Sequence, residues 1–121
     1  MSAPKPVFDL EDRLVEFACK CLAICDLLPN TWAGNNLEYQ LCKSGTAPAL
    51  IYGEAQAAES KADFIHKMKM VLKEIKETRI NLKIIKKKPL ILNPLVEQTL
   101  IESSELMAIF IKSIATAKSN K

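Results

Sequence analysis

The strongest helical pattern in the chain lies at residues 60–89, which read SKADFIHKMKMVLKEIKETRINLKIIKKKP. Apolar side chains and one threonine recur here at alternating intervals of four and three residues, at Phe64, Met68, Val71, Ile75, Thr78, Leu82 and Ile85. This spacing places all of them on one face of an α-helix. Ser60 is a typical N-cap with Asp63 at the third helical position, and Pro89 cannot continue the helix. The segment therefore predicts one long amphipathic helix.

Two helical patterns precede this segment. The first begins at Asp9 as its N-cap, ends at Pro29-Asn30, and carries an apolar face of Leu10, Leu14, Phe17, Cys21, Cys25 and Leu28. The second is expected from about Asn35 to Ala58 and contains Pro48 in its interior. Because proline lacks the backbone N–H and clashes with the preceding turn, we expect a kink near Pro48, with a full break as the alternative.

A fourth helix is predicted to open at Asn93-Pro94, an N-cap followed by proline at the first helical position. Its inner face is expected to consist of Val96, Leu100, Ser103, Met107, Phe110 and Ile114. A second apolar stripe lies on a neighbouring face, at Ile101, Ala108, Ile111 and Ala115. A band this wide exceeds what one bundle core requires. It indicates either a deeply packed helix or a subunit interface.

Four helices joined by short loops pack most simply as an antiparallel bundle. We therefore predict an all-α fold, an up-and-down four-helix bundle over residues 9–118, with an N-terminal arm at 1–8 and a frayed tail at 119–121. No apolar run is long enough for a membrane span, and acidic residues near the start argue against a secretory signal. A cytoplasmic protein with reduced cysteines is expected.

No motif for catalysis or for a cofactor is present in the sequence. Cys19 and Cys21 would point away from each other on a helix, and His66 lies on a different predicted helix. Buried cysteines are therefore expected, with neither metal nor cofactor, and the protein is not expected to be an enzyme. Metal or redox chemistry at Cys19, Cys21, Cys25 and Cys42 is a remote alternative.

The net charge of +3 conceals a strongly basic segment, because residues 61–88 contain ten basic and three acidic side chains. The lysines that share one face of the predicted helix, or extend it, are Lys69, Lys73, Lys76, Lys83, Lys86, Lys87 and Lys88. A row about 27 Å long, at 1.5 Å per residue, can follow a phosphate backbone. The alternative is a solvated face. Few aromatic residues accompany these lysines in the sequence, so base stacking is not supported.

Several short motifs occur in order along the middle of the chain: Gln40-Leu41-Cys42-Lys43-Ser44-Gly45-Thr46, Tyr52, Glu54-Ala55-Gln56, Ala58-Glu59-Ser60-Lys61, Asp63-Phe64-Ile65-His66-Lys67, Lys73-Glu74 and Glu77-Thr78. In this order they resemble the four-helix-bundle family of 23S ribosomal RNA intervening-sequence proteins. The likeness covers residues 8–118, including Arg13-Leu14 and Ile111-Lys112-Ser113-Ile114. It departs at Ala47-Pro48-Ala49-Leu50-Ile51, where family members have Ser-Ile-Gly-Ala-Asn, and at Lys43 and Gly53, where arginine is common.

The resemblance implies a ring-shaped homo-oligomer, a pentamer, with no known catalytic residues. The family is similar in fold to the accessory variability protein of diversity-generating retroelements, which binds nucleic acid and a reverse transcriptase. We therefore expect a non-enzymatic homo-oligomer that binds RNA or a ribonucleoprotein through the lysine face. A protein-interaction scaffold without a nucleic-acid role is the alternative, and no small-molecule substrate is indicated.

Overall fold

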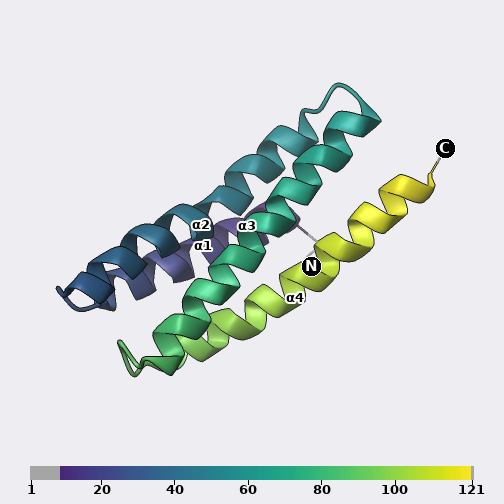
Figure 1. The fold of residues 1–121 in the computed structure, drawn as a ribbon. Helices are drawn as coiled ribbons and strands as arrows, with labels where there is room; N and C mark the ends of the chain where they lie inside the picture. Colours follow the sequence, from purple (N-terminus) through teal and green to yellow (C-terminus); the bar gives the residue numbers. More distant parts are fainter. Residues whose placement is uncertain (1–8, 121) are drawn as a thin grey trace, which may run out of the picture.

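The computed structural model describes residues 9–120 and contains four α-helices that lie side by side (Figure 1). They are α1 (Leu10–Leu27), α2 (Trp32–Gln56), α3 (Lys61–Lys87) and α4 (Pro94–Ser119). Each helix packs against the next one in the sequence, and α4 also packs against α1. The prediction of an all-α, up-and-down bundle is confirmed. The arm predicted at residues 1–8 lies outside the described residues.

Side-chain caps start three of the four helices where the sequence predicts them. The side chains of Asp9, Ser60 and Asn93 each accept a hydrogen bond from a backbone N–H of the first turn, at 3.1, 3.0 and 2.8 Å. Each cap satisfies a donor that has no partner inside its helix. Pro94 follows Asn93 at the helix start, where a missing N–H breaks no helical hydrogen bond.

The start of α2 differs from the prediction, because the helix begins at Trp32 and not near Asn35. Thr31 is the N-cap, and its hydroxyl accepts a hydrogen bond from the backbone N–H of Gly34 at 3.0 Å. A Cβ on Gly34 would lie 1.9 Å from the carbonyl oxygen of Pro29, so the loop folds back onto the first turn. The helix ends at Gln56, just before the predicted end.

The middle of α2 runs through Pro48 as one helix, so the alternative of a full break is wrong. The bend expected at Pro48 stays a prediction. Thr46 donates its hydroxyl to the carbonyl oxygen of Cys42 at 2.8 Å, which adds a hydrogen bond in the turn before the proline. Ser44 acts differently, because its buried oxygen accepts a hydrogen bond from the side-chain amide of Asn81 at 3.1 Å and so links α2 to α3.

The core follows the predicted apolar face of α3, where the buried residues are Met68, Val71, Ile75, Thr78, Leu82 and Ile85. On α4 the prediction is partly wrong. Thr99 and Leu106 are fully buried, whereas Leu100 and Met107 lie at the edge of the core and are half-buried. Thr99 enters the core because its hydroxyl donates to the carbonyl oxygen of Leu95 at 2.7 Å, which leaves only its methyl group to pack.

The last helix continues slightly beyond its predicted end. Ser119 is helical and Asn120 is the C-cap, with its N–H bonded to the carbonyl oxygen of Thr116 at 3.2 Å. The fraying predicted from residue 119 is therefore not seen at Ser119, and residue 121 lies outside the described range. Within residues 9–120, none of the helices offers a stretch that is apolar and long enough to span a bilayer.

Candidate nucleic-acid interface

The lysine face of α3 is formed by the seven lysines that the sequence singles out, and every one of them is exposed. Because Met68, Ile75 and Leu82 hold the opposite face of α3 in the core, the helix cannot turn these lysines inward. The capped start at Ser60 and the end at Lys87 make α3 the longest helix of the bundle, at 27 residues. The fold therefore presents the basic side chains along one long, continuous helix.

Acidic neighbours neutralise only part of the lysine face. Lys73 lies 3.9 Å from the carboxylate of Glu77, one turn along α3, and Lys86 forms an ion pair with Glu97 of α4. Exposed pairs of this kind contribute little free energy and exchange readily with other ions. Among residues 9–120, Lys69, Lys76, Lys83, Lys87 and Lys88 form no ion pair.

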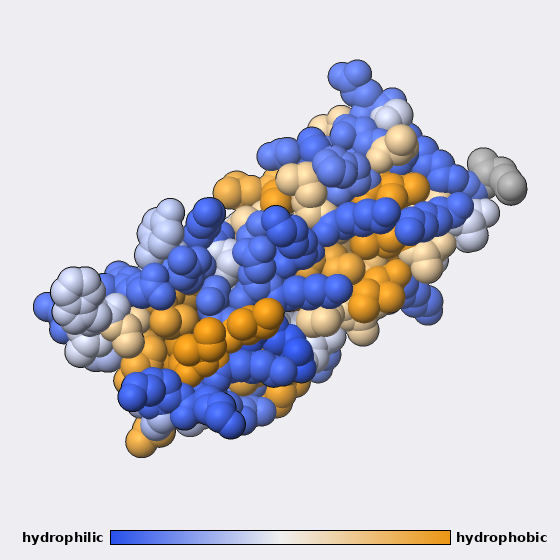
Figure 2. Space-filling view, viewed as in Figure 1, coloured by the Kyte–Doolittle hydropathy of each residue, from blue (hydrophilic) through white to orange (hydrophobic). Residues whose placement is uncertain are grey.

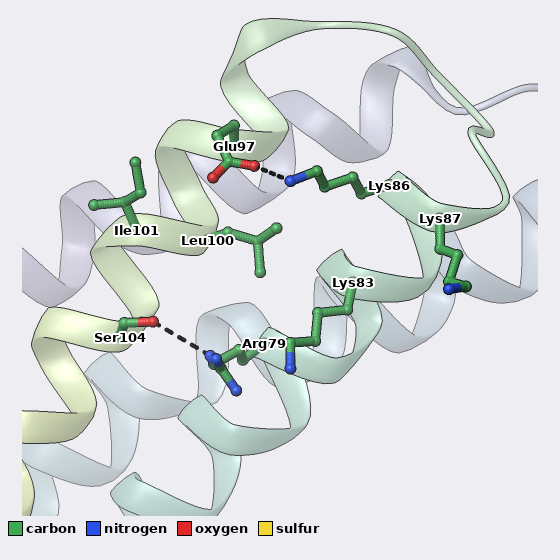
Figure 3. Close-up of a pocket in the computed structure, with 8 residues that line it drawn as sticks. All are labelled: Arg79, Lys83, Lys86, Lys87, Glu97, Leu100, Ile101 and Ser104. Atoms are coloured by element: carbon green, nitrogen blue, oxygen red, sulfur yellow. Dashed lines mark hydrogen bonds and ion pairs between the residues drawn. The ribbon is translucent and has the colours of Figure 1, made fainter.

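A groove between α3 and α4 adjoins the lysine face (Figure 3). Its lining consists of Arg79, Lys83, Lys86, Lys87, Glu97, Leu100, Ile101 and Ser104. Arg79 is a member that the sequence did not single out, because it lies away from the row of lysines and closer to α4. Its Nε donates a hydrogen bond to the hydroxyl of Ser104 at 3.3 Å, which directs the guanidinium into the groove. The groove thus combines cations with an apolar wall.

The second apolar stripe of α4 lies on the surface. Ile101 and Ile111 are 52% and 51% exposed, and Ala108 and Ala115 are exposed as well. The interpretation of this stripe as deep packing within the chain is therefore wrong. Because Ile101 also lines the groove, the predicted interface stripe and the lysine face meet there.

Two exposed isoleucines on α3 add to the apolar surface between the lysines. Ile80 and Ile84 are 55% and 45% exposed and line a shallow hollow together with Lys83, Lys87 and Lys88. Neither isoleucine was predicted as a site residue, although both fall outside the predicted buried face of α3. On the face of the molecule seen in Figure 2, orange apolar surface is broken up by blue hydrophilic side chains.

The cysteines are divided between the core and the surface. Cys21 and Cys25 are buried, as expected, whereas Cys19 and Cys42 are exposed, which differs from the expectation. Burial raises the pKa of the Cys21 thiol to about 12 and that of Cys25 to about 11. Both thiols are therefore protonated and unreactive at neutral pH. No group of three potential metal ligands exists within the described part of the chain.

Comparison with known proteins finds a similarity among solved structures. No protein-family model matches the chain, and no curated protein matches it. Among solved structures, it is similar to a protein with unknown function from the S23 ribosomal protein family of Bacteroides thetaiotaomicron VPI-5482. The two chains share 29% sequence identity and a TM-score of 0.81, and the similarity covers 88% of this chain and 98% of the other. This neighbour supports, at a coarse level, the resemblance found in the sequence motifs.

Proposed function

We propose that this protein is a member of the family of 23S ribosomal RNA intervening-sequence proteins and acts without catalysis. In this proposal it forms a homo-oligomer and binds RNA, alone or in a ribonucleoprotein, through the lysine face of α3. The order of motifs along α2 and α3 and the neighbour from the S23 ribosomal protein family support the family assignment.

The observation that carries the binding proposal is the lysine face itself. Its seven lysines are exposed along α3 and at its C-cap, and five of them form no ion pair among the described residues. A row of cations about 27 Å long releases counterions from a nucleic-acid backbone when it binds, so affinity falls steeply with salt. Contacts of this kind read shape and charge and carry little sequence information.

The exposed stripe of α4 supports the oligomeric part of the proposal. Ile101, Ala108, Ile111 and Ala115 offer exposed apolar side chains to a second copy of the chain. By the family resemblance, the assembly is a pentameric ring. In this proposal the ring is located in the cytoplasm. Each subunit of such a ring presents the same lysine face, and several weak faces act together on one polyanion.

A scaffold that recruits another protein is a second candidate function, favoured by one observation. Ile80 and Ile84 lie exposed among the lysines, and apolar surface of this kind suits a protein partner better than a phosphate backbone. In this case the lysines serve mainly to keep the assembly in solution.

Fluorescence anisotropy with labelled structured RNA and duplex DNA separates the two candidates. The wild type is compared with a variant in which Lys69, Lys73, Lys76 and Lys83 are changed to Glu. If the proposal is correct, the wild type binds with a clear salt dependence and the variant does not bind. If both proteins bind equally weakly, the scaffold becomes the better account.

A further inference from the structure

Two aromatic side chains of α2 are exposed to solvent. Trp32 is 96% exposed and Tyr39 is 63% exposed. They lie seven residues apart and therefore on one face of the helix, separated by about 10 Å along its axis. A tryptophan is highly buried on average, because its large ring gains from leaving water. Folding of a single chain therefore leaves both aromatic rings in contact with water.

Both residues line a shallow hollow on the surface. It is lined by Asn30, Thr31, Trp32, Asn35, Asn36 and Tyr39. Aromatic rings offer flat apolar faces, and asparagine amides both donate and accept hydrogen bonds. This combination suits a flat heteroaromatic ring with donors and acceptors on its edge, as in an unpaired nucleobase. Tyr39 also borders a second hollow, where Lys43 supplies a cation and Glu38 a carboxylate.

The loop and the first turn of α2 beside the hollow are ordered before any ligand binds. The side-chain amide of Asn35 donates to the side-chain oxygen of Asn30 at 3.1 Å, and the hydroxyl of Thr31 caps the helix through Gly34. The backbone of Gly34 lies so close to Pro29 that no Cβ fits between them. Because these contacts already order the loop, a ring that stacks on Trp32 loses little free energy in ordering it.

The fold brings this hollow to the same end of the bundle as the end of the lysine face. In the antiparallel pair of α2 and α3, Trp32 begins α2 where Lys86, Lys87 and Lys88 end α3 (Figure 1). In the sequence these lysines have few aromatic neighbours, which argued against base stacking. Trp32 is distant from these lysines in the sequence, but it supplies an aromatic ring at the same end of the bundle.

We propose that the hollow around Trp32 and Tyr39 binds unpaired nucleobases of a single-stranded RNA segment. This inference rests on the proposed function and adds a preference to it: the lysine face attracts any polyanion, and the aromatic hollow selects the single-stranded part. Stacking of bases on aromatic side chains tolerates any base, so little sequence preference is expected.

Trp32 is the only tryptophan, so its intrinsic fluorescence reports on the hollow directly. The wild type is titrated with oligouridylate, with the corresponding single-stranded DNA, and with a duplex RNA of equal length. We expect oligouridylate to quench the emission, whereas duplex RNA binds, as judged by anisotropy, without quenching. The DNA arm shows whether the 2′-hydroxyl contributes.

Variants then assign the effect to the aromatic pair. Trp32→Ala and Tyr39→Ala should each weaken oligouridylate binding about tenfold, measured by anisotropy of a labelled strand, and leave duplex affinity unchanged. Leu50→Ala removes another exposed apolar side chain of α2, 69% exposed and outside the hollow, and should change neither affinity.

Three results would overturn the inference. If Trp32→Ala binds oligouridylate as tightly as the wild type, the hollow is not the site, although the proposed function stands. If the emission of the free protein is already that of a buried tryptophan, the aromatic pair is covered by another copy of the chain. If neither single-stranded nor duplex nucleic acid binds at low salt, the proposed function fails together with this inference.

Discussion

Arg13 of α1 donates two hydrogen bonds to the carboxylate of Glu102 of α4, from Nε at 2.7 Å and from Nη2 at 3.0 Å. The same Nη2 also donates to Glu105 at 2.7 Å. The carboxylates raise the pKa of the guanidinium through these hydrogen bonds. Because α1 and α4 are the first and last helices, this fork closes the bundle at the edge that has the least other packing.

Loss of the fork should therefore loosen that edge. We expect Arg13→Ala to lower the free energy of unfolding by about 1–3 kcal/mol, since the interaction is charge-assisted and partly shielded from water. Urea denaturation followed by circular dichroism measures the change. Arg13→Lys keeps the charge but not the planar fork, and it should recover less than half of the loss. An Arg13→Ala variant as stable as the wild type would show that the fork is incidental.

At Gly45 the backbone of α2 lies close to Cys21 of α1. A Cβ at this position would lie 2.6 Å from the Cβ and 2.7 Å from the Sγ of Cys21, so Gly45→Ala must push the two helices apart. We expect a loss of about 1–3 kcal/mol in the free energy of unfolding. Gly53→Ala is the matched control in the same helix, because its Cβ would meet nothing within 4 Å. It should raise stability by about 0.5–1 kcal/mol, and equal effects of the two substitutions would contradict the packing.

The buried thiol of Cys21 predicts a loss of stability in alkali. Burial raises its pKa from 9.0 to about 12, so the folded chain keeps a proton that the unfolded chain has already lost. Between these values the unfolded state binds fewer protons, and stability falls as the pH rises, by at most about 1.4 kcal/mol per pH unit. Cys21→Ala should show a flatter fall than the wild type between pH 9 and 11 in urea denaturation. Cys19→Ala controls for the loss of one thiol, and parallel profiles of Cys21→Ala and wild type would refute the assignment.

The stripe of α4 predicts a separable effect on assembly. Ile111→Glu places a charge in the proposed subunit interface, and light scattering should report a smaller particle. Helicity should persist, because Ile111 is 51% exposed and the chain core does not depend on it. Leu50→Glu, at a more exposed apolar position on α2, should leave the particle size unchanged. A full-sized particle for Ile111→Glu would remove this stripe from the interface.

The parts of the fold that depend on local chemistry could be predicted from the sequence. The caps at Asp9, Ser60 and Asn93 and the buried face of α3 follow from side-chain type and spacing alone. The start of α2 could not be placed, because it depends on the contact between Gly34 and the carbonyl of Pro29. Hydropathy likewise placed Leu100 in the core ahead of Thr99, since the hydrogen bond that permits burial of a threonine is not visible in composition.

The sequence predicted only the part of the candidate site that lies on a single helix. The lysine face lies on one helix, so helical spacing was enough to find it. Arg79 donates a hydrogen bond to Ser104 on another helix. The hollow at Trp32 lies at the same end of the bundle as the end of the lysine face only through the antiparallel arrangement of α2 and α3. Relationships of this kind depend on tertiary packing.

The central claim is that the lysine face of α3 binds nucleic acid, and that the overall charge of the protein does not account for the binding. Two variants with equal net charge test it: Lys69, Lys76 and Lys83 changed to Glu, and Lys20, Lys61 and Lys118 changed to Glu. Affinity for structured RNA is measured by anisotropy over a range of salt concentrations. We predict that the first variant loses binding and most of the salt dependence, whereas the second stays within about threefold of the wild type, because it leaves the phosphate contacts intact. Equal losses in both variants would contradict the claim.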